Sequence, residues 1–190
     1  MKIRKAVLAL SLLVVLTSVR VGASDACRVF NDSSVRCHFH TYQGDWTNML
    51  AHVELESTTS LHVDCTDPSA YPTMLPPGAF ASFENLKWLQ LDSCRLAELP
   101  NRSLLGLQRL EHLRIQTRNA DWPGTSLVIA DNIFRDVPAL ISLDLAFNDM
   151  RLLLGPILCP LHGLARFNLT GNRLIDLKWI ESGCASSLQV

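Results

Sequence analysis

The sequence predicts an α/β solenoid of the horseshoe type, with a parallel β-sheet on its concave side, an irregular convex side and a cysteine-containing cap at its N-terminal end. Three observations predict this fold: a motif that recurs about every 24 residues, an apolar triplet before each copy, and nine prolines. Prolines at this frequency argue against the alternative, a bundle of long amphipathic helices with coincidental leucines.

The motif follows the leucine-rich-repeat pattern L-x-x-L-x-L-x-x-N/C-x-L. Its four copies begin at residues 86, 110, 140 and 164, and the second copy matches only through Ile115. In each copy, alternation along a short strand directs two apolar residues into the core. Asn148 and Asn172 stand where a buried amide can bond the backbone of the next turn, and Cys94 takes that position in the first copy. The inward pairs are Leu89/Leu91, Leu113/Ile115, Leu143/Leu145 and Phe167/Leu169.

An apolar triplet with a spacing of three residues leads into each copy, and it predicts a short return segment that closes the core from the convex side. A single coil cannot bury its own apolar residues, so stability depends on stacking with neighbouring coils. The triplets are Phe80/Phe83/Leu86, Leu104/Leu107/Leu110, Phe134/Val137/Leu140 and Leu158/Leu161/Leu164.

The stretch LRIQTRNADWPGTSLVI, residues 113–129, begins as a regular copy and then carries an inserted loop. Arg118 stands where the pattern has asparagine, and the next core leucine, Leu127, comes about seven residues late. Two interpretations of the loop stay open. Trp122 packs on the flank of the solenoid, or Asp121 and Trp122 form a lateral contact for a ligand or co-receptor, since insertions in solenoids often gather on a binding face.

The N-terminal region divides into a leader and a cap. Three basic residues, an apolar run of 14 residues and the small residues before Ser24 predict a secretory signal peptide over 1–23. A membrane span would need about 20 apolar residues. Residues 24–57 form the expected cap, with strands over 35–39 and 52–56. Residues 58–190 then supply about five coils, of which LHVDC (61–65) is a degenerate first and the last is truncated.

Six cysteines in a secreted chain indicate disulfides, although the sequence alone permits fifteen connectivities. The repeat frame favours three pairs, because it places partners on neighbouring coils or within the cap: Cys27–Cys37, Cys65–Cys94 and Cys159–Cys184. A zinc site at Cys37, His38 and His40 is the weaker alternative, since a second ligand cluster is missing from the sequence. Three sequons, at Asn31, Asn101 and Asn168, are predicted N-glycosylation sites.

Composition argues against several functions. A net charge of −1 gives no basic face for nucleic acid or an anionic membrane. The sequence has neither a nucleophile–base pattern nor a phosphate-binding glycine loop, so we expect a non-enzymatic protein without cofactor or metal. The frame directs polar side chains of both charge signs onto the concave face, among them Lys87, Gln90, Asp92, Glu111 and Gln116. The candidate partner contacts are Trp88, His112, Arg114, Asp121 and Trp122. Two interpretations of Trp88 stay open, since this large aromatic residue either anchors a partner or packs against the cap.

From about Cys27 to Val190 the chain resembles the N-terminal leucine-rich-repeat part of an arthropod Toll receptor, in particular the 18-wheeler-like branch. The resemblance rests on LQLDSCRLAELP, on TRNADW after LRI, and on ILCPLHGLARFNLTGNRLIDL. It implies a single-pass receptor of innate immunity or development that recognises a cysteine-knot, Spätzle-like protein ligand and can pair with a second receptor.

The chain ends on the opening residues of another repeat strand, so we expect it to be a fragment of a longer receptor. Such a chain would be extracellular: secreted as written, or on the outer side of the plasma membrane through a segment that this sequence lacks. The alternative is a secreted leucine-rich-repeat protein that acts alone, as a soluble decoy or as a matrix or adhesion component.

Overall fold

The computed structural model describes residues 26–39, 50, 53–65, 73–117, 119, 125–153, 155–176 and 184. The predicted signal peptide and the loop residues 120–124 lie outside these ranges, so both interpretations of Asp121 and Trp122 stay open.

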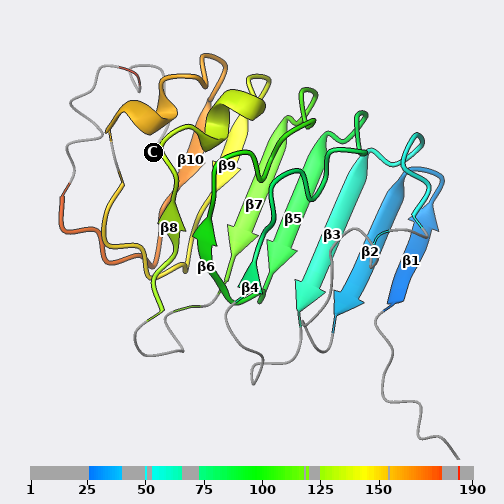
Figure 1. Cartoon of the computed structure of the whole chain (residues 1–190), viewed down its shortest axis with the longest axis horizontal. Coiled ribbons are helices and arrows are strands. Elements are labelled where there is room, and N and C mark those ends of the chain that lie inside the picture. Colours follow the sequence, from blue (N-terminus) through cyan, green and yellow to red (C-terminus); the bar gives the residue numbers. More distant parts are fainter. Residues whose placement is uncertain are drawn as a thin grey trace, which may run out of the picture.

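Seven strands form one continuous sheet, and every neighbouring pair except the first is parallel. Figure 1 shows the strands side by side along the length of the molecule. This is the parallel solenoid sheet that the repeat predicts. In sheet order the strands are β1 (Ala26–Asn31), β2 (Ser34–Phe39), β3 (Ser60–Cys65), β5 (Trp88–Asp92), β7 (His112–Gln116), β9 (Ser142–Asp144) and β10 (Arg166–Asn168).

The core lies between this sheet and the return segments. The four inward pairs are buried except for Leu169, which is half-buried at the last coil, and the residues of all four convex triplets are no more than 3% exposed. Neighbouring strands pair in register, so that Leu89 lies beside Leu113 and Leu113 beside Leu143. The predicted core is therefore confirmed, and each coil buries its apolar residues against the next.

The convex side consists mainly of turns and short 3₁₀ helices, η2 (Ile133–Asp136) and η3 (Gly155–Leu158). It also contains a small parallel sheet that the repeat pattern did not predict, made of β4 (Thr73–Met74), β6 (Leu96–Leu99) and β8 (Val128–Ile129). In Figure 1, β6 and β8 run opposite to the parallel strands of the main sheet, because the chain returns along this side of each coil.

The cap is a β-hairpin whose second strand joins the parallel sheet. Strand β2 covers the strand expected over 35–39, and β3 covers the degenerate coil at 61–65. The prediction of a strand over 52–56 is wrong for the described residues 53–56, which form a turn. Val53 is buried and donates its N–H to the carbonyl of Leu50, and the Thr58 hydroxyl donates to the carbonyl of Glu54. These local bonds compete with strand formation.

Three disulfides join the same pairs that the repeat frame favours. Cys27 and Cys37 are directly paired residues of the hairpin, with Cα atoms 3.9 Å apart. The Cys65–Cys94 bond links the end of β3 to the turn after β5, and the Cys159–Cys184 bond lies on the convex side of the last coils. Because Cys37 is oxidised, it cannot serve as the thiolate ligand of the alternative zinc site.

A ladder of asparagines closes the turns after the strands. Asn148 is fully buried and donates to the carbonyls of Ile115 and Leu145, which belong to consecutive coils. Asn172 repeats this arrangement one coil later, with bonds to the carbonyls of Leu145 and Leu169. The predicted role of these asparagines is therefore confirmed, and each one satisfies buried backbone groups of its own coil and of the coil before.

Candidate functional site on the concave face

In-register pairing arranges the outward side chains of the main sheet in rows that cross the strands. Three such rows cover the concave face from β3 towards the C-terminal coils. The first row is Ser60, Trp88, His112, Ser142 and Arg166; the second is His62, Gln90, Arg114, Asp144 and Asn168; the third is Asp64, Asp92 and Gln116.

The first row contains an aromatic pair on adjacent strands. The rings of Trp88 and His112 have centroids 4.6 Å apart and planes inclined by 34°. Trp88 is nevertheless 42% exposed, so the pair offers apolar surface to the solvent. The sequence left open whether Trp88 anchors a partner or packs against the cap. Its described ring contact is with His112, in the coil after its own.

Burial and two neighbouring charges shift the pKa of His112. Partial burial lowers the pKa of His112 below its ordinary value of 6.5, and the nearby positive charge of Arg166 lowers it further. The carboxylate of Glu111 acts in the opposite direction, and that carboxylate also pairs with Lys87 Nζ at 2.9 Å. A neutral imidazole can stack on the indole ring without the cost of burying a charge.

The second and third rows form a network of opposite charges and amides. Asp92 Oδ2 lies 2.9 Å from His62 Nε2 and accepts a hydrogen bond from Gln90 Nε2. Arg114 Nε lies between two carboxylates, 3.7 Å from Asp92 Oδ1 and 3.9 Å from Asp144 Oδ2. These charges compensate one another, so the concave face has no single-sign field to steer a partner.

Gln116 extends this network across the strands. It accepts a hydrogen bond from Arg114 Nη2 at 2.8 Å and donates one to Asp144 Oδ2 at 3.2 Å. Held in this way, Arg114 has less freedom to reorient towards a ligand, although it is 41% exposed. The network is therefore better described as a preformed polar border of the aromatic pair than as a cationic site that adapts to a ligand.

Three of the five candidate contact residues lie together on this face. Trp88 and His112 are neighbours in the first row, and Arg114 lies in the second row on the same strand as His112. The face also includes His62, Asp144 and Arg166, which were not among its predicted residues. The sequence could have assigned them to this face, since each one alternates with a buried residue in its strand.

The three sequon asparagines are all exposed, and each carboxamide oxygen accepts a backbone N–H. The donors are Ser33 for Asn31, Asn132 for Asn101 and Thr170 for Asn168. Asn168 ends the second row on β10, so a glycan on it would cover that end of the concave face. Glycosylation of these residues stays a prediction.

Within the described ranges, His, Cys, Asp and Glu side chains form no group of three or more that could hold a metal ion. The same residues include no helix that is both long and apolar enough to cross a membrane.

Comparison with known proteins agrees with this architecture. No family model matches the chain. Over 120 residues, or 63% of its length, the chain is 35% identical to Toll-like receptor 7 of Drosophila melanogaster. The chain is similar in sequence to a Toll receptor. It spans only 8% of that receptor's length, and the 18-wheeler-like branch stays a prediction.

One solved structure supports the leucine-rich-repeat fold, and a second has a lower similarity. The chain in the TLR13–ssRNA13 complex superposes with a TM-score of 0.56 over 75% of this chain and 18% of that chain, at 23% identity. Human 5T4, a Wnt-activated inhibitory factor, gives a TM-score of 0.45 over 84% of this chain and 67% of its own, at 19% identity.

Proposed function

We propose that this chain is the ligand-binding N-terminal leucine-rich-repeat region of a Toll-type receptor ectodomain, and that the Trp88–His112 pair anchors a protein ligand. The observation that carries the proposal is a half-exposed tryptophan in ring contact with His112 beside a preformed polar network. Tryptophan is enriched among the residues that dominate interface energies, and polar borders commonly surround such residues.

The ligand class follows from the resemblance to Toll receptors and from charge. A protein of the cysteine-knot, Spätzle-like type is the proposed ligand, and a second receptor is the proposed further partner. The TLR13 structure holds single-stranded RNA. This chain has a net charge of −1 and a concave face of mixed sign, whereas RNA binding needs basic residues along the backbone path. We therefore propose protein recognition, outside the cell, without enzymatic activity.

The proposed organisation keeps a leader over 1–23, a cap over 24–57 and repeats over 58–190. Ligand contacts would lie on β3, β5 and β7, because a glycan on Asn168 would obstruct β10. The alternative of a stand-alone secreted protein is tested by the transcript: one that continues through further repeats to a membrane span contradicts it.

A binding experiment tests the anchor. The secreted chain is immobilised, and recombinant processed Spätzle-like proteins are passed over it in a surface-plasmon-resonance measurement. Trp88→Ala should weaken binding by about thirtyfold, the effect of a residue worth about 2 kcal/mol at an interface. Ile175→Ala, which alters an exposed apolar residue away from the main sheet, is the matched control and should leave affinity unchanged. Equal affinity of wild type and Trp88→Ala would contradict the anchor, and absence of binding by wild type would contradict the ligand class.

A further inference from the structure

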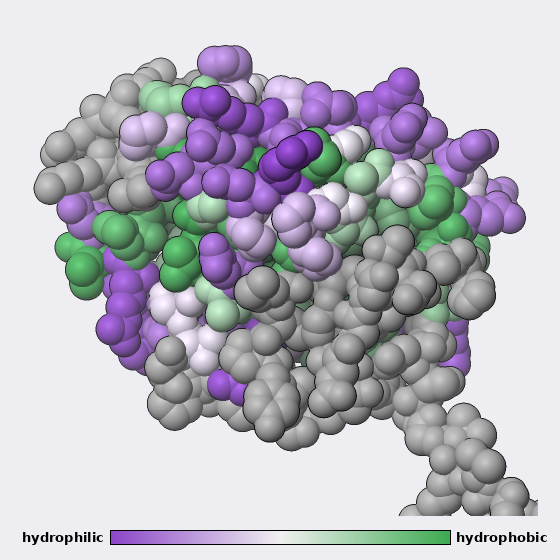
Figure 2. Space-filling view, in the orientation of Figure 1, coloured by the Kyte–Doolittle hydropathy of each residue, from purple (hydrophilic) through white to green (hydrophobic). Residues whose placement is uncertain are grey.

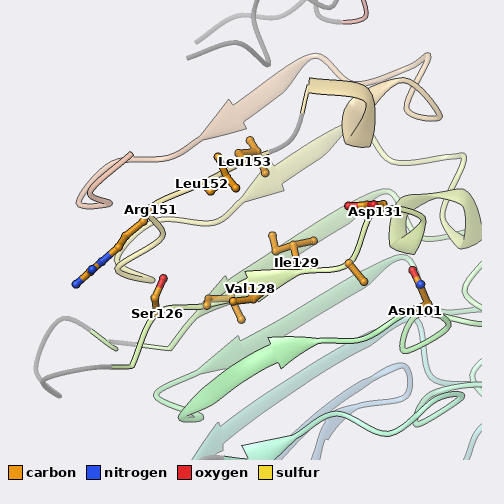
Figure 3. Close-up of a pocket in the computed structure, with 10 residues that line it drawn as sticks. Asn101, Ser126, Val128, Ile129, Asp131, Arg151, Leu152 and Leu153 are labelled. Atoms are coloured by element: carbon orange, nitrogen blue, oxygen red, sulfur yellow. The ribbon is translucent and has the colours of Figure 1, made fainter. Parts of the chain in front are cut away.

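A groove of about 560 Å³ lies on the convex side, away from the concave face. One wall is residues 126–131, which include β8, and the other is residues 151–153 of the next coil. Figure 3 shows Ser126 and Arg151 at one end of the groove and Asn101 with Asp131 at the other. The sequon asparagine thus lies at the rim of a cavity of the size that binds small ligands.

The groove exists because the small convex sheet stops at β8. Within the described residues, β8 pairs with β6 on one side, and residues 151–153 beyond it do not form a strand. The coil that contains β8 is the one lengthened by the insertion, so its return segment and the next one are not in regular succession. An unpaired strand edge leaves backbone donors and acceptors available to an occupant.

The lining combines apolar walls with polar ends. Val128 is 59% exposed and Leu152 is 55% exposed, and both border the groove over the buried Ile129 and Leu153. Figure 2 shows hydrophobic patches on this side of the molecule, below an upper edge rich in hydrophilic residues. Asp131 and Arg151 add one charge of each sign at opposite ends. Such a lining fits a neutral, amphipathic occupant better than an ion.

An N-linked sugar has these properties. N-acetylglucosamine is uncharged and has apolar ring faces, an acetamido methyl group and hydroxyls at its edges. The ring faces can cover apolar side chains while the hydroxyls bond polar groups at the groove ends. Asn101 is exposed, and its Oδ1 accepts the N–H of Asn132 at 3.2 Å, which fixes the plane of the carboxamide that would carry the sugar.

We infer that the groove holds the first sugars of a glycan attached to Asn101, which cover Val128 and Leu152. The glycan then replaces the strand that the convex sheet lacks beside β8. This assignment does not depend on the concave anchor, since the groove and the Trp88–His112 pair involve different residues and opposite sides of the coils.

The test uses the chain secreted from mammalian cells with uniform high-mannose glycans. Glycopeptide mass spectrometry first measures occupancy at Asn101 and Asn31. Endoglycosidase H is then applied to the folded protein, and release is followed at each site. Release at Asn101 should be on the order of tenfold slower than at Asn31, which corresponds to about 1.4 kcal/mol of protection. After reduction and unfolding, the two rates should become equal.

A variant separates the groove from other causes of slow release. Val128→Ser with Leu152→Ser should raise the rate at Asn101 to that at Asn31, because the apolar walls are lost. Ile175→Ser, which also alters an exposed apolar residue, should change neither rate. The residues altered are exposed, and an unchanged rate at Asn31 checks that the fold persists. An unmodified Asn101, equal native rates at the two sites, or slow release that persists in the double variant would each overturn the inference.

Discussion

The coil that begins at Leu140 and the coil that begins at Leu110 occupy equivalent places in the solenoid, but they close their turns differently. In the regular coil, Asn148 bonds the carbonyls of two consecutive coils. In the irregular coil, Arg118 stands at the asparagine position, and the fully buried Asn119 donates instead to the carbonyl of Leu96. A buried amide is therefore required near this turn, but it need not stand at one fixed position.

The regular coil also stabilises the irregular one. Asn148 Oδ1 accepts both the N–H and the hydroxyl of Thr117, at 2.8 Å each, where the irregular chain leaves the sheet. The carbonyl of Asn148 accepts the N–H of Leu127, where that chain returns to the core. One asparagine thus fixes both ends of the inserted segment, which explains how a coil with six more residues than its neighbours still stacks in register.

The largest expected effect follows from this double role. Asn148→Ala would leave the carbonyl of Ile115 and both Thr117 groups without their buried partner, whereas the carbonyl of Leu145 keeps its bond from Asn172. We expect the free energy of unfolding to fall by at least about 3 kcal/mol, since each buried unsatisfied group costs roughly 1–3 kcal/mol. Urea unfolding of the disulfide-intact chain measures this. Asn132→Ala, at an exposed asparagine whose side chain makes no capping bond, is the control. Asn172 is half-buried and serves as a comparison. If Asn148→Ala lowers the free energy of unfolding by less than Asn172→Ala does, the double role of Asn148 is contradicted.

A smaller effect is expected for Asn119→Ala. This change removes the bond to the carbonyl of Leu96, but it also removes Asn119 Oδ1, a buried oxygen that has no hydrogen-bond partner among the described residues. The two consequences partly offset each other, and we expect a loss of about 1 kcal/mol. Hydrogen exchange should show faster exchange near β6 and β7 with little change at β9 and β10. Exchange that rises uniformly along the solenoid would mean that the irregular turn supports the whole molecule.

The smallest effect concerns pH. The strand of the irregular coil keeps the regular concave face, and His112 on it has a lowered pKa because of burial and Arg166. The unfolded chain therefore takes up a proton first as the pH falls below about 6.5, so the contribution of His112 to stability is complete above that pH and is lost below it. In NMR titrations, Arg166→Ala should raise the pKa of His112, and Glu111→Gln should lower it. A pKa that Arg166→Ala leaves unchanged would contradict the assigned charge effect, and His112→Gln should remove the corresponding pH dependence of the urea midpoint.

The sequence by itself determined the solenoid and its core. The inward leucines, the convex triplets and the asparagine position follow from local alternation and spacing. This pattern is present within the sequence of each single coil. For the same reason, the alternation within β5 and β7 is enough to assign Trp88, His112 and Arg114 to the concave face. The late return of the chain at Leu127 was also readable, because it is a displacement of the same local pattern.

Only the tertiary structure decided which residues meet between coils. The partner of Thr117 lies 31 positions away in sequence and that of His62 lies 30, so no local pattern specifies either contact. Three other features likewise depend on how neighbouring coils stack: the bond from Asn119 to Leu96, the turn at 53–56 where a strand was expected, and the groove beside β8. Local periodicity sets the shape of each coil, whereas hydrogen bonding and packing across coils set the details of the surface.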